Sequence, residues 1–186
     1  MNLDSPPPPV LHLVCGKIAA GKSTLTRRLA DDAKAVLIGE DVWLSQLYPG
    51  EIRSVGDYVR RSAQLRNALA PHIESLLLCG LSVVLDFPAN TVGNRGWMKD
   101  IYERAGASHV LHYLDVPDDV CKMRLHVRNA SQAHAFAPSD AEFDEITRYF
   151  VPPSGDEGFH VVRYINFEST ESGNRPYYHG SSSSER

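Results

Sequence analysis

The sequence predicts an α/β domain with a mostly parallel sheet, and three observations favour that class. Short apolar segments alternate with longer segments of helical periodicity. A glycine-containing turn joins the first apolar segment to the first helical segment. The chain has 186 residues, of which 42% are hydrophobic and 23% charged, and these values suit one domain with an ample core.

Five segments are expected to form strands. Residues 10–15 form the first strand and residues 110–114 the fourth. Residues 35–38 and 81–85 are apolar enough to be buried on both faces, as the strands of parallel sheets are. Residues 159–165, with two valines at their centre, are the candidate fifth strand.

Segments with an apolar period of 3.6 residues fill the gaps. Residues 22–30 form the first helix, and the capping-box pattern at residues 54–57 begins a long one. Residues 91–105 form a further helix, and residues 117–128 open with proline and two acidic residues. A second capping box at residues 139–142 begins a short helix. The apolar stripe of the long helix consists of Tyr58, Leu65, Leu69, Ile73 and Leu76.

The turn after the first strand fits the phosphate-binding pattern G-x-x-x-x-G-K-[ST] at every fixed position. Gly16 and Gly21 let the backbone curl so that successive N–H groups converge on phosphate oxygens. Lys22 would bring its charge to the β- and γ-phosphates, and the Ser23 hydroxyl would bind Mg²⁺. The predicted nucleotide-binding residues are Gly16, Lys17, Ile18, Ala19, Ala20, Gly21, Lys22, Ser23 and Thr24.

Carboxylates follow the second and third strands, at the edge of an α/β sheet where ligands bind. Asp41 is the candidate general base that takes a proton from a hydroxyl acceptor, and Glu40 is the second candidate. Asp41 could instead cap a helix that starts near Val42. Asp86 ends the third strand as a candidate Mg²⁺ ligand, with a solvated strand-end aspartate as the alternative.

Arg124 and Arg128 lie four residues apart and therefore share one helix face. Beside a mobile lid, the two guanidinium groups could clamp a triphosphate and stabilise charge on the transferring group. A solvated cationic face is the alternative. The lid is expected at about residues 124–150, because residues 129–138 are rich in alanine and small polar side chains.

The remaining features set the boundaries of the domain and the class of protein. Residues 1–9 are expected to be a proline-rich leader, residues 10–168 the domain and residues 169–186 a flexible polar tail.

No apolar run reaches the roughly 20 residues of a membrane span, and no secretory leader is recognisable, so a cytoplasmic protein is expected. Three scattered cysteines suit core positions, the histidines form no metal-binding pair, and a formal charge of −4 makes nucleic acid an unfavoured partner.

The segments GKIAAGKST, IGED, VVLDFPANT and LDVPDDVCKMRLHVRN resemble bacterial AAA-family ATPases of the small P-loop kinase type. That group is similar to polynucleotide kinase, zeta toxin and gluconate kinase domains. The resemblance implies a P-loop NTPase fold, a five-stranded parallel sheet of order 2-3-1-4-5 with helices on both faces and a small lid. It also implies ATP with Mg²⁺ and transfer of the γ-phosphoryl group to a hydroxyl, with roles for Lys22, Ser23, Asp41, Asp86 and the arginine pair.

The sequence departs from this group at two places. Polynucleotide kinases have a segment similar to S-x-D-x-x-R after the second strand. In this sequence, Leu44 stands at the position of that arginine. The phosphate loop carries Ile18, Ala19 and Ala20 in place of the common proline and glycine, which backbone binding tolerates.

These observations predict an ATP-dependent phosphotransferase that acts on a hydroxyl of a small molecule such as a sugar, an antibiotic or a nucleoside. The first alternative is a nucleotide-dependent switch or assembly ATPase without such an acceptor. The second is a polynucleotide end kinase with a phosphate track on the long helix. The residues of that track would be Arg53, Arg60, Arg61 and Arg66. The acceptor, the choice between ATP and GTP, the oligomeric state and the choice of Asp41 or Asp86 as base stay open.

Overall fold

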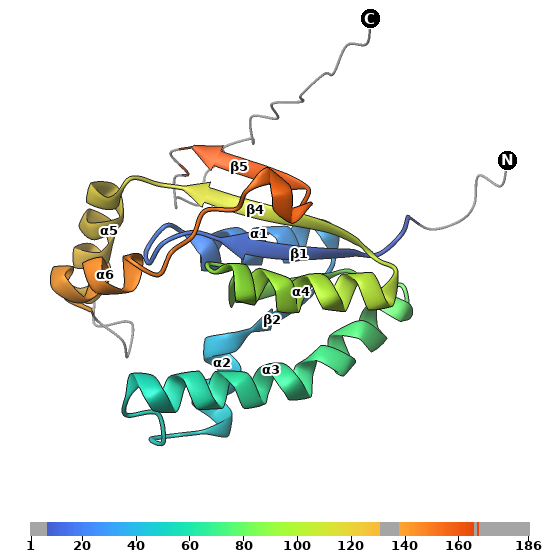
Figure 1. The fold of residues 1–186 in the computed structure, drawn as a ribbon, viewed down its shortest axis with the longest axis horizontal. Helices are drawn as coiled ribbons and strands as arrows, with labels where there is room; N and C mark the ends of the chain where they lie inside the picture. Colours follow the sequence, from blue (N-terminus) through green and yellow to red (C-terminus); the bar gives the residue numbers. More distant parts are fainter. Residues whose placement is uncertain (1–6, 131–137, 166, 168–186) are drawn as a thin grey trace, which may run out of the picture.

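The computed structural model describes residues 7–130, 138–165 and 167 (Figure 1). Its centre is one sheet of five parallel strands in the order β2-β3-β1-β4-β5, which confirms the expected sheet and its order. The strands are β1 (Val10–Cys15), β2 (Val36–Gly39), β3 (Val83–Pro88), β4 (Ser108–Asp115) and β5 (Val161–Ile165).

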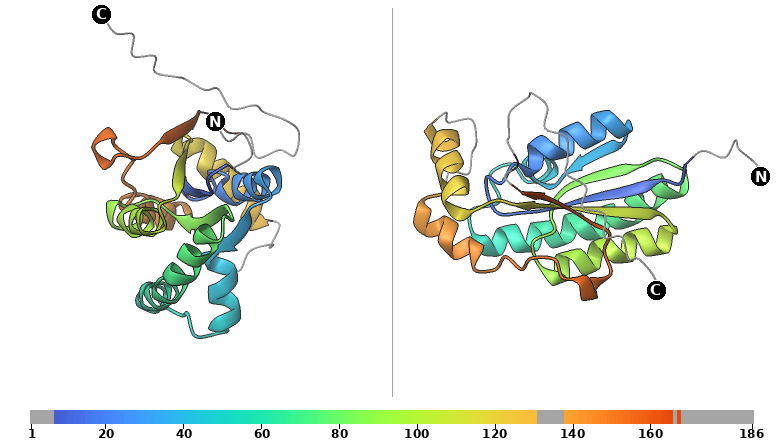
Figure 2. Two further views of the ribbon diagram at one scale, coloured as in Figure 1. Left: turned by 90° about the vertical axis from the view of Figure 1, so that its right-hand side faces the viewer. Right: turned by 90° about the horizontal axis from the view of Figure 1, so that it is seen from above.

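Helices cover both faces of the sheet, with α1 on one face and α3 and α4 on the other (Figure 2). Helices α5 and α6 lie at the carboxyl ends of the strands, where the arrowheads of β4 and β5 point (Figure 1). The helices are α1 (Lys22–Ala33), α2 (Glu40–Leu47), α3 (Val55–Leu78), α4 (Val92–Ala105), α5 (Asp118–Ala130) and α6 (Asp140–Thr147), with a short 3₁₀ helix, η1 (Gly155–Glu157).

Two apolar clusters fill the space between the layers. The larger cluster packs the inner sides of α3 and α4 against β1, β3 and β4, with Ile73, Leu85 and Met98 fully buried. The smaller cluster joins the phosphate loop to α1, α5 and α6 through residues such as Ala20 and Leu125. The loop is therefore anchored in packed side chains, although loops usually run over the surface.

The edge position of β2 corrects one expectation. Val36 and Leu37 are 36% and 41% exposed, so this strand is not buried on both faces. The strand order explains the exposure, because β2 has only β3 as a neighbour. Periodicity identifies a strand but not its place in the sheet.

Two details of α3 also differ from expectation. The side chain of Ser54 accepts a hydrogen bond from the Asp57 backbone, but the Asp57 carboxylate accepts from the backbone of Arg53 rather than from that of Ser54. The capping box is thus only half formed. Leu77 is buried at the end of the stripe, and Leu76, which was expected there, is only partly buried against the core.

The cysteines only partly match the core positions expected for them. Cys15 and Cys121 are buried, whereas Cys79 is exposed at the end of α3. Within the described ranges, none of the helices is both long and apolar enough to pass through a lipid bilayer.

Candidate active site

The phosphate loop connects β1 to α1 and approaches the backbone of β4 closely. A Cβ atom at Gly16 would lie 3.1 Å from the carbonyl oxygen of Leu114 and 3.3 Å from Cβ of Ala20. The Gly16 amide donates a hydrogen bond of 3.0 Å to Oδ1 of Asn90. A side chain at this position would crowd the backbone of β4, which is a reason for glycine that the sequence pattern does not reveal.

Positive φ angles shape the rest of the loop. Gly21 has φ 105° and is the N-cap of α1, without a side-chain cap. Ala19 has φ 58°, in the left-handed region that favours glycine. The loop therefore keeps the backbone path of a phosphate-binding turn although alanine stands at a position that glycine would suit better.

Lys22 bends back across the loop that it follows. Its Nζ donates to the carbonyl oxygens of Gly16 and Lys17 at 2.7 and 2.8 Å. Burial lowers the pKa of Lys22, and the carboxylates of Asp86 and Asp41 oppose that shift. The ammonium group therefore lies within electrostatic reach of both predicted site carboxylates.

The two carboxylates come from neighbouring strand ends. Asp86 pairs in register with Gly39, the last residue of β2, and Asp41 follows two residues later in the first turn of α2. Asp86 lies within β3 rather than after it, two residues before the strand ends. Ser23 is exposed in the first turn of α1. The sheet thus brings Asp41 and Asp86 toward Lys22 at the carboxyl ends of the strands, and Ser23 follows Lys22 in the chain.

The two acidic residues in the first turn of α2, Glu40 and Asp41, have different environments. The helix begins at Glu40 with Gly39 as its N-cap, so Asp41 is not the capping residue. Glu40 is 1% exposed and forms an ion pair of 2.9 Å with Arg66. Glu40 is therefore a buried residue bonded within the protein, whereas Asp41 is exposed at the surface of the first turn.

The two arginines of α5, Arg124 and Arg128, have different surroundings. Arg124 donates to the carbonyl oxygens of Ala20 and Phe167 at 3.3 and 2.6 Å, so it contacts the phosphate loop itself. Burial lowers the pKa of Arg128, and the Asp41 carboxylate acts in the opposite direction. The charge of Arg128 is therefore close enough to Asp41 for the two groups to interact electrostatically. The predicted lid spans α5 and α6, and its residues 131–137 lie outside the described part of the chain.

Arg95, in the first turn of α4, has a structural role. It is fully buried, and its guanidinium group forms an ion pair with Glu157 at 2.6 Å. The same group also donates to the carbonyl oxygens of Ala89 and Val151. Arg95 thus holds the segment before β5 against α4 and cannot reach a ligand in this conformation. Nothing in a lone arginine on a helix start signals such burial.

The fold and the loop together define a P-loop NTPase domain of the kinase-like type. The chain belongs to the AAA domain family AAA_33, whose family model matches residues 11–153. No curated protein matches the chain.

Solved structures with the same fold include several kinases. A putative kinase from Chloroflexus aurantiacus aligns with a TM-score of 0.70 at 20% identity, covering 88% of this chain and 94% of that one. The APS kinase of Mycobacterium tuberculosis, in complex with AMPPNP and APS, has a TM-score of 0.56 at 20% identity, with 88% and 91% covered. A gluconokinase from Sinorhizobium meliloti has a TM-score of 0.51 at 16% identity, with 84% and 82% covered.

Proposed function

We propose that the protein transfers the γ-phosphoryl group of ATP to a hydroxyl of a small molecule. The proposal depends mainly on one observation: Lys22 interacts electrostatically with Asp41 and Asp86 at the carboxyl ends of the strands. The kinases among the similar structures support the same reaction type, and the AMPPNP in one of them supports ATP as donor.

The chain's own groups have distinct parts in this reaction. The loop amides and Lys22 hold the phosphates, for which Nζ would exchange its two carbonyl contacts for phosphate oxygens. The oxygen of the acceptor hydroxyl bonds to the γ-phosphorus, and Asp41 accepts the proton that this hydroxyl loses. The bond from that phosphorus to the bridging oxygen breaks, and ADP leaves. Arg128 offsets the negative charge that spreads over the transferring group.

A magnesium ion fits the donor set at this edge of the sheet. Ser23 offers a hydroxyl and Asp86 a half-buried carboxylate, and Mg²⁺ takes few protein oxygens beside phosphates and water. When bound, the ion would neutralise charge between the β- and γ-phosphates.

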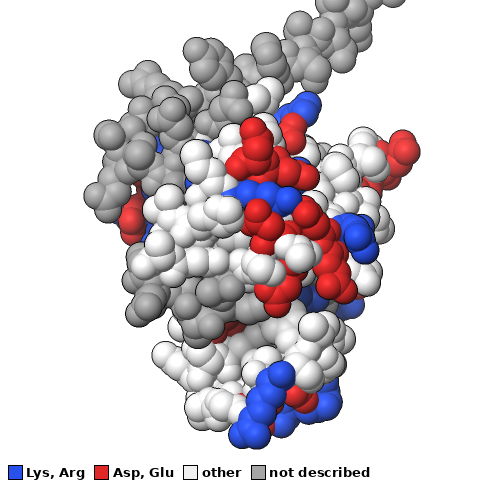
Figure 3. All heavy atoms as spheres, turned by 90° about the vertical axis from the view of Figure 1, so that its left-hand side faces the viewer, with Lys and Arg blue, Asp and Glu red and all other residues white. Residues whose placement is uncertain are grey.

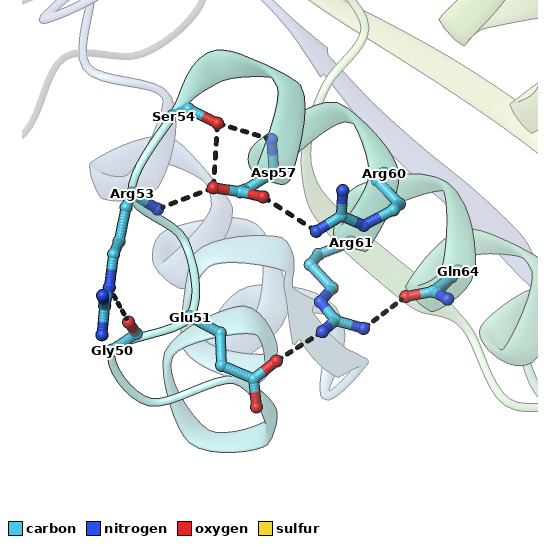
Figure 4. A network of polar contacts seen from close by, with 8 residues as sticks. All are labelled: Gly50, Glu51, Arg53, Ser54, Asp57, Arg60, Arg61 and Gln64. Atoms are coloured by element: carbon cyan, nitrogen blue, oxygen red, sulfur yellow. Dashed lines mark hydrogen bonds and ion pairs between the residues drawn. The ribbon is translucent and has the colours of Figure 1, made fainter.

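A small acceptor suits the charges better than a nucleic-acid end does. The arginines at the start of α3 are engaged within the protein: Arg60 forms an ion pair with Asp57, Arg61 pairs with Glu51, and Arg53 donates to the Gly50 carbonyl (Figure 4). Figure 3, which looks onto the carboxyl-end face, also shows acidic side chains gathered in its upper half. A phosphate track would have to displace these pairs, so we set the end-kinase alternative second.

The substitution Asp41→Asn tests the proposal. A panel of sugars, nucleosides and aminoglycosides is screened for stimulated ADP formation, and the variant is then assayed with the acceptor found. The variant should keep its affinity for magnesium ATP and lose transfer by about 100-fold or more, because an amide accepts no proton. A normal kcat in the variant refutes the role of Asp41, and stimulation only by a protein partner favours a nucleotide-dependent switch.

A further inference from the structure

A buried polar network lies beside the candidate base and was not foreseen from the sequence. Glu40, the residue before Asp41, accepts a hydrogen bond of 2.8 Å from the Tyr58 hydroxyl through Oε2. Its Oε1 accepts from Nε of Arg66 at 3.0 Å, and the second terminal nitrogen of Arg66 lies 2.9 Å from the same oxygen. Both carboxylate oxygens of Glu40 are thus engaged in the interior.

The network continues from α3 to α4 and β3. Arg66 donates to Oδ1 of Asn94 at 2.7 Å, and Nδ2 of Asn94 donates to the carbonyl oxygen of Pro88 at 2.8 Å. The guanidinium group of Arg66 also lies 5.7 Å from the centre of the Trp97 ring. Three helices and the end of β3 are therefore joined through one arginine.

This network fixes the two places from which the site carboxylates project. Glu40 begins α2 and Asp41 is its second residue, so a fixed Glu40 side chain restrains the first turn of that helix. Pro88, at the other end of the network, lies two residues after Asp86. Both Glu40 and Asp41 raise the pKa of Tyr58, in addition to the larger effect of burial, so the hydroxyl of Tyr58 lies near both carboxylates.

We propose that Glu40 and Arg66 are positioning residues that hold Asp41 in the orientation needed to accept the acceptor's proton. The proposal rests on the proposed phosphotransfer function. Stability alone does not account for the pair, since buried ion pairs are often replaceable by apolar side chains without loss. Neither residue touches the substrates; both act through the backbone and first turn of α2.

The test measures ADP formation at saturating magnesium ATP, with water as the smallest hydroxyl acceptor. Glu40→Gln and Arg66→Gln should each lower kcat at least about ten-fold while the KM for ATP stays within about two-fold, because the phosphate loop is untouched. The double variant should be no slower than the slower single variant, because the two residues act as one unit. Losses that multiply in the double variant contradict the proposal.

Glu157→Gln is the matched control, because it changes another glutamate that pairs with an arginine away from Asp41. Thermal unfolding should show that it lowers the melting temperature as Glu40→Gln does, while kcat stays within about two-fold of the wild type. Equal losses of kcat in both variants would mean that the Glu40 effect is general destabilisation, and the proposal falls.

Two further variants keep the outcome interpretable. Arg66→Lys retains the buried charge but cannot contact Glu40 and Asn94 together, so a folded variant with wild-type kcat overturns the proposal. Asp41→Asn is the reference for the function. If it leaves ADP formation intact, the proposed function fails and the positioning role with it; if it stops ADP formation while Glu40→Gln does not, only the positioning role fails.

Discussion

At the scale of single residues, Ala19 carries an unfavourable backbone conformation. Its φ of 58° costs an L-residue with a Cβ roughly 1–2 kcal/mol relative to the right-handed region. Ala20, the next residue, is fully buried in the apolar cluster under the loop and has no positive φ. The two neighbouring alanines therefore differ in what a glycine would do.

Ala19→Gly should raise the free energy of unfolding by about 0.5–1 kcal/mol, because glycine adopts positive φ without strain. Ala20→Gly should lower it, because a buried methyl group is lost and the chain gains freedom when unfolded. Urea unfolding of both variants measures the difference. A destabilised Ala19→Gly variant would contradict the conformational argument.

The sequence predicted some of these residues and could not predict others. A local pattern predicts Lys22 and Ser23, and the rule that strand ends meet at one edge predicts Asp41 and Asp86. The register of β2 and β3 pairs Gly39, two residues before Asp41, with Asp86. The pairing of Glu40 with Arg66 spans 26 positions, and no local period reports such a contact. Long-range partners of buried charges need the fold before they can be assigned.

At the scale of elements, α5 carries two arginines with different surroundings, Arg124 and Arg128. Arg124 donates a hydrogen bond to the Ala20 carbonyl of the phosphate loop, whereas Arg128 interacts electrostatically with Asp41. Arg128→Ala should lower kcat by about 100-fold or more with little change in ATP affinity. Arg124→Ala should also weaken ATP binding, because the loop loses a support. Turnover assays and binding titrations separate the two, and identical profiles would refute this division.

Three strands share a buried histidine network on the sheet. Nδ1 of His12 and Nε2 of His112 lie 3.1 Å apart, and the other ring nitrogen of His112 is 2.9 Å from the Tyr164 hydroxyl. Burial lowers the pKa of His112 to about 3, from an ordinary value of 6.5. The folded protein therefore keeps this ring neutral at pH values where the unfolded chain protonates it.

The pH dependence of stability follows from that shift. Above pH 6.5 the His112 ring is neutral in both the folded and the unfolded state. Between pH 6.5 and about 3, only the unfolded state binds the proton. Lowering the pH in this range therefore destabilises the fold by up to about 1.4 kcal/mol per pH unit. His112→Gln should flatten this part of the profile in urea unfolding between pH 7.5 and 4.5. An unchanged slope would show that other groups account for it.

The strands also show what periodicity can and cannot predict at this scale. All five were expected from apolar segments, and each appears within a few residues of its expected place. The exposure of Val36 and Leu37 was not foreseen, because the burial of a strand depends on its neighbours. The exposure of β2 follows from its edge position in the strand order, and that order was implied only by the resemblance to small kinases.

At the scale of the whole molecule, the sheet, the loop and the arginines of α5 converge on one edge. Three parts of the fold support the phosphate loop. Ala20 packs in one apolar cluster with Leu114 of β4, Asn90 after β3 accepts a hydrogen bond from the loop, and Arg124 of α5 donates one to it. A loop held from three sides is already shaped before a ligand arrives, so nucleotide binding should require little rearrangement there. The central claim is that this loop and Lys22 bind a nucleoside triphosphate.

Calorimetric titration of the wild type and of Lys22→Ala with magnesium ATP tests that claim most directly. The wild type should give a saturable heat of one site per chain, and the variant should give none or bind far more weakly, because it loses the ammonium group at the phosphates. Equal binding by the two proteins, or no heat from the wild type at saturating magnesium with either ATP or GTP, would contradict the account.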